Sequence, residues 1–213
     1  MKALLLADLY QTWIHCKFYL LFVAVAAAVT AAGGAEGNMG SFMAVYAMIM
    51  CSMMGMSLVQ LDEASHWNLY AQALPATRKD QVSSKYAVTL LCFGVVLALF
   101  AVIFVILALL GRMTWAMAGV QTAVLAVLGL LAPAFSMPAM FRWGSNKGRV
   151  IFLAVIIAVS CGAGVFFSAF PFDSSGLPDL PVPVLIALAA LIPVALFIGS
   201  WTLAVRWYEK RDL

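Results

Sequence analysis

The chain has 213 residues, of which 65% are hydrophobic and only 10% are charged. Soluble globular domains carry roughly 25% charged and about 45–50% apolar residues, so this composition excludes a soluble domain and places the chain in a lipid bilayer. The formal net charge of +3 is too small to suggest nucleic-acid binding.

Six runs of the chain contain no Asp, Glu, Lys or Arg, and each is at least 18 residues long. A helix needs about 20 residues to cross a hydrocarbon core of about 30 Å, and only helices or closed barrels satisfy their backbone hydrogen bonds there. The runs therefore predict an all-α integral membrane protein with a single domain over residues 1–213. Its six transmembrane helices are expected at about residues 18–35, 38–61, 86–110, 115–139, 150–170 and 182–205.

The basic residues set the expected orientation. With the N-terminus inside, eleven of the 12 Lys and Arg residues lie on the cytoplasmic side, and only Arg112 lies outside. The acids lean the other way, since Glu36, Asp173 and Asp179 are external. This asymmetry follows the positive-inside rule and predicts that both termini are cytoplasmic.

Residues 1–17 precede the first apolar run and are expected to form an amphipathic helix. Polar side chains recur at i, i+3, i+4 and i+7, at Asp8, Gln11, Thr12 and His15. Leucines and a tryptophan line another face, which is the pattern of a helix lying in the membrane interface. A cleaved signal peptide is the competing interpretation, but a stretch of this length is not a short basic leader.

Seven of the 12 methionines crowd the second span. Flexible thioethers suit a surface that accepts varied apolar ligands, so Met43, Met50 and Met54 are candidates for a substrate pathway. The alternative, which is favoured, is that these side chains fill gaps between helices, as methionine does in any core.

Residues 62–85 form the longest stretch predicted to lie in the cytoplasm. Trp67, Tyr70 and Leu74 recur at helical spacing, so residues 62–74 predict a short amphipathic helix that ends at Pro75. The sequence Thr77-Arg-Lys-Asp80 has the form of a capping box and opens a helix that continues into the third span. A helix of about three turns is marginal alone in water, so its aromatic face needs lipid headgroups, the protein's own helix ends or a partner.

The six spans hold no ionisable residue, which disfavours a proton-driven transporter or a membrane protease. No metal-binding or catalytic spacing is present, and no GxxxxGK[ST] loop is available to bind ATP phosphates. We therefore expect no catalytic residues, no metal site and no bound cofactor. Any energy from ATP would come from another polypeptide.

Two loops carry a resemblance to a known family. Glu63, Trp67, Leu74-Pro75, Arg78 and Lys85-Tyr86 resemble, in order, the acid, aromatic, Leu-Pro, Arg and Lys-Tyr series of small permeases in the type-2 ATP-binding-cassette exporter family. The second loop, Phe141-Arg142-Trp143-Gly144 with Lys147-Gly148-Arg149, is similar to that family's Phe-Lys-Phe-Gly and Lys-Gly-Arg stretch. The six-span layout and the N-terminal helix agree with the family along the whole chain.

The resemblance implies a single multi-pass permease domain in a bacterial cell membrane. Such a permease pairs with a second copy or a paralogous permease, and with two separate ATPase subunits that bind ATP and Mg²⁺. In the family the first cytoplasmic loop supplies the coupling helix that docks on the ATPase, and here it would be Asp62–Leu74. The implied contacts of the first loop are Asp62, Glu63, Trp67, Tyr70, Leu74, Pro75, Arg78 and Lys85.

The second loop, with Arg142, Lys147 and Arg149, would be a further ATPase contact. Binding to anionic lipid headgroups is an equal alternative for this basic loop.

Among type-2 exporters the chain looks like the permeases of the phenol-soluble-modulin exporter kind, which expel amphipathic peptides. The resemblance implies export rather than import, and an uncharged, methionine-rich interior suits an amphipathic or hydrophobic cargo. The alternative from another class is a non-transporting immunity or scaffold subunit that uses the loop helix only to bind a partner. A membrane enzyme is the weakest alternative, because the spans lack catalytic groups.

Overall fold

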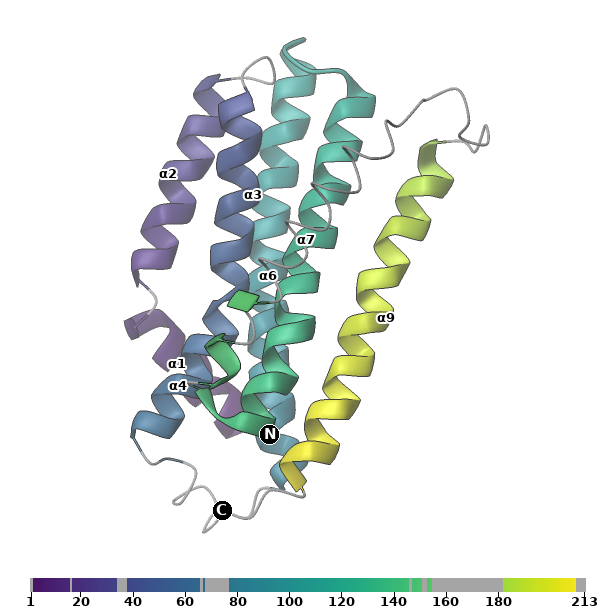
Figure 1. Ribbon diagram of the computed structural model, residues 1–213. Helices are drawn as coiled ribbons and strands as arrows, with labels where there is room; N and C mark the ends of the chain where they lie inside the picture. The colour runs from purple at the N-terminus through teal and green to yellow at the C-terminus, as the bar shows by residue number, and fades with distance from the viewer. Residues whose placement is uncertain are drawn as a thin grey trace.

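In the computed structural model the described residues are 2–15, 17–33, 38–65, 67, 77–145, 147–150, 153–154 and 182–209. The long helices α2, α3, α6, α7 and α9 run side by side, and α1 and α4 lie at one end of this bundle (Figure 1). We call this end, where α6 begins and α7 and α9 finish, the loop end. The helices are α1 (Lys2–His15), α2 (Lys17–Gly33), α3 (Asn38–Ser52), α4 (Met54–Ala64), α6 (Arg78–Leu109), α7 (Trp115–Trp143) and α9 (Val182–Glu209).

All regular secondary structure in the described part of the chain is helical, which confirms the predicted class. Three helical stretches of this described part are long and apolar enough to cross a bilayer. They are Gly40–Ala64, which runs through α3 and α4, Arg78–Leu109, which is α6, and Trp115–Trp143, which is α7. The pair Leu4–Ile14 and Lys17–Ala32, bent by 66°, makes a fourth if it forms one span. The chain is therefore a multi-pass membrane protein. Six spans remain a prediction, and most of the span expected at residues 150–170 lies outside the described residues.

The helix α6 shows why the bundle belongs in lipid. One face of α6 packs against the bundle, and the opposite face exposes apolar side chains. Among these, Val95 is 61% exposed and Leu109 is 70% exposed. A helix that is apolar on all sides is stable only when both faces meet an apolar environment, here the bundle on one side and lipid on the other. The buried face follows the helical repeat through Val82, Tyr86, Thr89, Phe93, Val96, Phe100, Phe104 and Leu107.

The capping box predicted at the start of α6 is confirmed. Thr77 Oγ1 accepts a hydrogen bond from Asp80 N, and Asp80 Oδ2 accepts one from Thr77 N, both at 3.2 Å. With 32 residues, α6 is about 48 Å long, which exceeds the hydrocarbon thickness by several turns. All charged residues of α6 lie within its first eight residues, so the end expected to project beyond the hydrocarbon is the loop end. At the opposite end Gly111, with φ of 72°, allows the chain to turn into α7.

The methionines of the second span mainly fill the helix interface. Met48, Met54 and Met56 are 0%, 2% and 4% exposed and belong to one hydrophobic core with residues of α6 and α7. Met43 and Met50 are half-buried. Of the three methionines suggested for a substrate pathway, Met54 thus lies inside the core, and the other two retain some exposed surface.

Gly55 permits the close approach of α4 to α6 and α7. A Cβ atom at this position would overlap Thr89 Oγ1 and lie 2.9 Å from Met137 Cε. Thr89 cannot easily move, because its hydroxyl donates a hydrogen bond to Lys85 O at 2.8 Å. Gly55 is therefore required by packing at this point.

We predict that Gly55→Ala lowers the free energy of unfolding by about 1–3 kcal/mol, the usual cost of overpacking a tight core. The matched control is Gly94→Ala in the middle of α6, where an added Cβ meets nothing within 4 Å. The control gains the same helix propensity, so it should be neutral or more stable by up to about 1 kcal/mol. Unfolding of both variants in mild detergent measures the difference, and equal midpoints would contradict the prediction.

Candidate functional site

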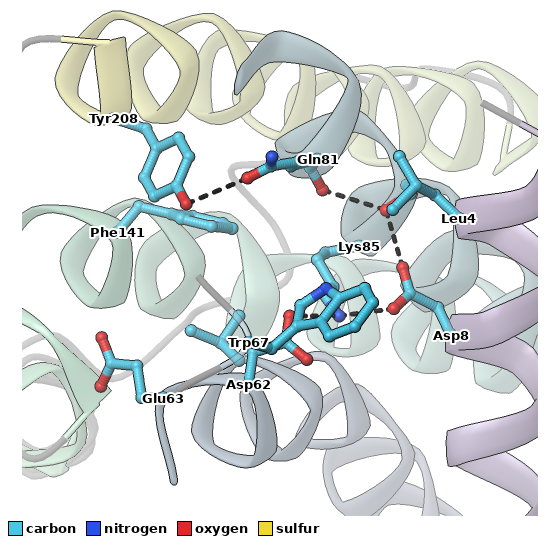
Figure 2. A pocket seen from close by; sticks show the side chains of 11 residues that line it. Leu4, Asp8, Asp62, Glu63, Trp67, Gln81, Lys85, Phe141 and Tyr208 are labelled. Atoms are coloured by element: carbon cyan, nitrogen blue, oxygen red, sulfur yellow. Dashed lines mark hydrogen bonds and ion pairs between the residues drawn. The ribbon is translucent and has the colours of Figure 1, made fainter. Parts of the chain in front are cut away.

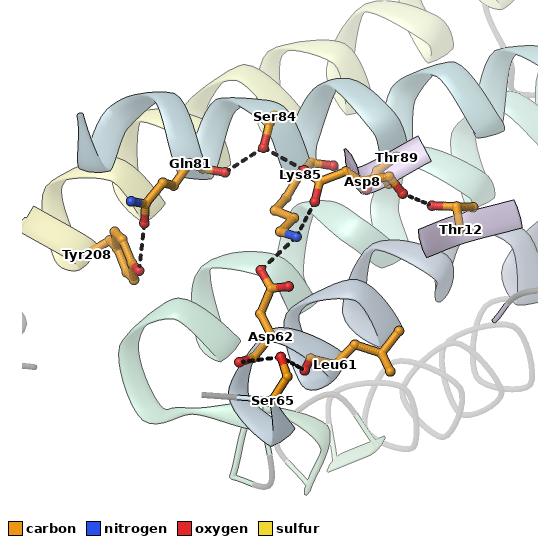
Figure 3. Close-up of polar contacts among 10 residues, drawn as sticks. All are labelled: Asp8, Thr12, Leu61, Asp62, Ser65, Gln81, Ser84, Lys85, Thr89 and Tyr208. Carbon is orange, nitrogen blue, oxygen red and sulfur yellow. Dashed lines mark hydrogen bonds and ion pairs between the residues drawn. The ribbon is translucent and has the colours of Figure 1, made fainter. Parts of the chain in front are cut away.

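Three ionisable side chains meet in the interior at the loop end (Figure 3). The Nζ atom of Lys85 in α6 lies 2.5 Å from Asp8 Oδ1 in α1 and 2.7 Å from Asp62 Oδ2 in α4. Asp8, Asp62 and Lys85 are 5%, 6% and 5% exposed. We call these three residues the buried ion cluster. It joins three helices that are far apart in the sequence.

Hydroxyl groups next to the buried ion cluster hold its α1 side. Ser84 Oγ donates a hydrogen bond to Asp8 Oδ2 at 2.7 Å, so consecutive residues of α6 bind both oxygens of one carboxylate. Thr12 Oγ1 donates to the Asp8 carbonyl oxygen at 2.8 Å. The polar face of α1 therefore lies against the bundle, whereas Trp13 on its apolar side is 66% exposed. A helix packed against the bundle in water would bury its apolar face and expose its polar one. The opposite arrangement of α1 suits contact between its apolar face and lipid.

The buried ion cluster contains two carboxylates and one ammonium group. Asp62 lies in the last turn of α4, where the helix dipole disfavours a negative charge. Its Oδ1 atom is buried and has no hydrogen-bond partner among the described residues. Buried charges are tolerated only when they are paired, so Lys85 is the group that offsets the desolvation of both acids.

A cavity of about 30 Å³ lies against the buried ion cluster (Figure 2). A space of this size has room for one or two water molecules. Glu63 and Trp67, which begin the first predicted cytoplasmic loop, line it together with Gln81 and Tyr208. The wall of the cavity therefore includes residues of the loop that is predicted to contact an ATPase, together with residues of α1, α7 and α9.

Glu63 connects the two predicted cytoplasmic loops. Its Oε2 atom accepts a hydrogen bond from Ser145 N at 2.7 Å. Ser145 follows Gly144, whose φ of 83° ends α7, and Gly148 N donates to Gly144 O at 2.9 Å to close a new helical turn. A carboxylate is favoured at the start of such a turn, where backbone N–H groups have no helical partner. This hydrogen bond therefore joins the start of the first loop to the start of the second loop.

Polar contacts also attach the end of α9 to the start of α6. The hydroxyl oxygens of Tyr86 and Ser200 lie 2.8 Å apart, and Tyr208 Oη donates to Gln81 Oε1 at 3.2 Å. Arg78 Nη1 donates to Tyr208 O at 3.5 Å. The loop end is therefore held by side-chain hydrogen bonds in addition to apolar packing.

The residues predicted to bind a partner differ in their placement. Asp62 and Lys85 lie in the interior, where they bind each other. The half-buried members are Glu63, Trp67 and Arg78, and the exposed ones are Arg142, Lys147 and Arg149. Tyr70, Leu74 and Pro75 lie outside the described residues, as does most of the expected coupling helix at residues 62–74.

Sequence reasoning missed the role of Asp8. It is the only acid in the first 35 residues, and the polar pattern around it predicts the solvent-facing side of an interfacial helix. An isolated acid beside a membrane span usually has a basic partner, and this signal could have been used. It would not have identified Lys85, because nothing local connects positions 77 residues apart.

We predict that Lys85→Met lowers the free energy of unfolding by about 3–5 kcal/mol, because it leaves two buried carboxylates without a cation. The control Lys17→Met removes an exposed lysine and should change stability by no more than about 0.5 kcal/mol. Adding Asp8→Asn and Asp62→Asn to Lys85→Met should recover much of the loss. Denaturation in mild detergent measures all three proteins. A Lys85→Met protein as stable as the wild type would contradict the pairing.

Comparison with known proteins identifies the family. A family model described as ABC-2 family transporter protein matches residues 3–209, which is nearly the whole chain. No curated protein and no solved structure gives a match. The match agrees with the all-helical bundle and with the resemblance of the two loops. The chain belongs to the ABC-2 transporter family, and it is a membrane permease of an ATP-binding-cassette transporter.

Proposed function

We propose that this permease exports amphipathic peptides or similar hydrophobic substrates, driven by a separate ATPase. Family membership implies an ATP-binding-cassette ATPase partner. The observation that carries the proposal is the loop end, where Glu63 binds Ser145 and Asp62 binds Lys85. A force applied to the first loop reaches α6 and the end of α7 through these contacts. Such a linkage is what a permease needs if it is moved from the cytoplasm.

In this proposal the first loop, residues 62–74, docks on the ATPase as a coupling helix. Glu63, Trp67 and Arg78 stand at its two ends and have some exposed surface. Lys147 and Arg149 are exposed in the second loop and supply a further contact for an acidic surface. Asp62 and Lys85 act behind this surface, because they fix α4 and α6 to α1.

Alternating access needs helices that move as stiff units. The length of α6 and its packing against α7 and α9 suit this role, since a push at residues 78–85 is carried along the whole helix. We propose that the permease works as a homodimer, or as a heterodimer with a paralogous permease, with the substrate passing between the two copies. Met43 and Met50 are half-buried and belong to the proposed pathway, whereas Met54 supports it from the core.

The cargo assignment follows from the chemistry of the spans. The part of α6 from residue 86 to its end at Leu109 carries no charge, and neither does α7 before Arg142. An ion or sugar would find few polar partners there, whereas an amphipathic peptide could enter from the membrane with its apolar face in contact with lipid-like side chains. The type of peptide exporter that resembles the chain in its loops has the same cargo chemistry.

The proposal is tested by reconstituting the permease with its ATPase in vesicles and following a fluorescent amphipathic peptide. We expect transport that requires ATP and a peptide-dependent rise in ATP hydrolysis. A stable complex whose ATPase activity and vesicles do not respond to any such peptide would instead identify a scaffold or immunity subunit. A permease that binds no ATPase would contradict the proposal altogether.

We predict that the double variant Trp67→Ala, Leu74→Ala uncouples the ATPase, because it removes the aromatic and aliphatic anchors of the proposed coupling helix. Peptide-stimulated ATP hydrolysis should fall at least tenfold, roughly the loss of one well-packed anchor, while the unfolding midpoint stays close to that of the wild type. The control is Trp115→Ala, which removes an exposed tryptophan (61%) at the opposite end of the bundle. Unchanged complex formation and transport in the double variant would contradict the coupling-helix assignment.

A further inference from the structure

An apolar groove runs between α7 and α9 near the loop end. Its volume is about 510 Å³, within the range of about 300–1,000 Å³ that is usual for ligand pockets. Small buried residues, among them Ala134, Ala139 and Ser200, form its floor, and larger exposed side chains such as Phe135 and Leu203 stand beside it. The groove is separate from the buried ion cluster and its small cavity.

One end of the groove carries a cation in contact with two tryptophan rings. Trp143 and Trp207 both line the groove, and their ring centroids lie 6.0 Å apart. The guanidinium carbon of Arg142 lies 4.8 Å from the Trp143 ring centroid and 4.5 Å from that of Trp207. Stacking on an aromatic face orients a guanidinium group and leaves its N–H donors free to bind an anion.

The charge of Arg142 has no acidic partner among the residues that the structure describes. The Arg142 side chain is exposed. A ligand that matches this site therefore has a long apolar portion and one anionic group at its end. Tryptophan is enriched at the level of lipid headgroups, where such a molecule has its charge.

We propose that this groove binds an anionic phospholipid, with an acyl chain between α7 and α9 and the phosphate at Arg142. Guanidinium groups bind phosphate oxygens in pairs, which gives an anionic headgroup an advantage over a zwitterionic one. The proposal assigns Arg142 to lipid and leaves Lys147 and Arg149 as the basic residues of the ATPase contact.

A second copy of the chain suits this groove less well. Homodimers are usually two-fold symmetric, so a contact centred on the groove would bring the two Arg142 side chains close together. Two like charges without an acid between them oppose such a contact. A phospholipid supplies the missing negative charge.

Two substitutions test the two halves of the site. Arg142→Gln removes the cation and keeps a polar side chain of similar length. Gly199→Leu fills the groove, and an added Cβ at this position meets no atom within 4 Å, so the protein need not rearrange. The matched control is Gly94→Leu in α6, which also has open space around its Cβ and lies outside the groove.

The experiment is native mass spectrometry of the delipidated permease titrated with phosphatidylglycerol or with phosphatidylcholine. We expect the wild type and Gly94→Leu to bind phosphatidylglycerol more tightly than phosphatidylcholine. Arg142→Gln should lose most of this preference, roughly a tenfold change, as for one charge-assisted hydrogen bond. Gly199→Leu should weaken the binding of both lipids by about tenfold, since an acyl chain can no longer bury its methylene groups.

Several outcomes would overturn the proposal. The first is an unchanged phosphatidylglycerol preference in Arg142→Gln, and the second is equal lipid binding by Gly199→Leu and Gly94→Leu. A dimer that Gly199→Leu dissociates without loss of bound lipid would assign the groove to a second copy. An amphipathic peptide whose binding Gly199→Leu removes, while phosphatidylglycerol still binds, would assign it to cargo.

Discussion

The arrangement of the loop end depends on Lys85. Its ammonium group is the only cation in contact with Asp8 and Asp62 among the described residues, and it lies at the point where α1, α4 and α6 meet. Without Lys85, the carboxylates of Asp8 in α1 and Asp62 in the last turn of α4 would both be buried without a cation. The charge of one lysine therefore permits the first helix of the chain to pack across the base of the bundle with its polar face inward. The apolar face, with Leu6 and Trp13, is then left to lipid.

Local patterns in the sequence were sufficient to predict the helical class and the capped start of α6, but not the division of the expected span 38–61 into α3 and α4. The capping box of Thr77 and Asp80 depends on residues three positions apart, so its chemistry is visible in the sequence and has the expected geometry in the structure. The apolar runs likewise predicted membrane helices, because burial in lipid requires only composition and length. These features need no knowledge of which helices become neighbours.

The candidate site could be predicted only in part, because its contacts are made between helices. Glu63 and Lys85 were identified through the loop pattern, but the sequence says nothing of the bond from Ser145 to Glu63 or of the pairing of Lys85 with Asp8. The absence of charge within the six runs is correct as a statement of composition. It does not show that charges next to the runs fold inward, because the burial of Asp8, Asp62 and Lys85 depends on the packing of α1, α4 and α6 against one another.

The charged residues at the loop end fall into two groups, an exposed group suited to binding a partner and a buried group that fixes the helices. One residue could not do both. A charge that binds a partner must be exposed and can be exchanged for another at small cost, whereas a buried pair is costly to break and adds little stability beyond what apolar packing would give. Its main effect is on geometry, because the short contacts of Lys85 fix the register of α1 against α6 and of α4 against both. In the proposed mechanism, exposed Lys147 and Arg149 would contact the ATPase, while the buried ion cluster would keep α1, α4 and α6 in register.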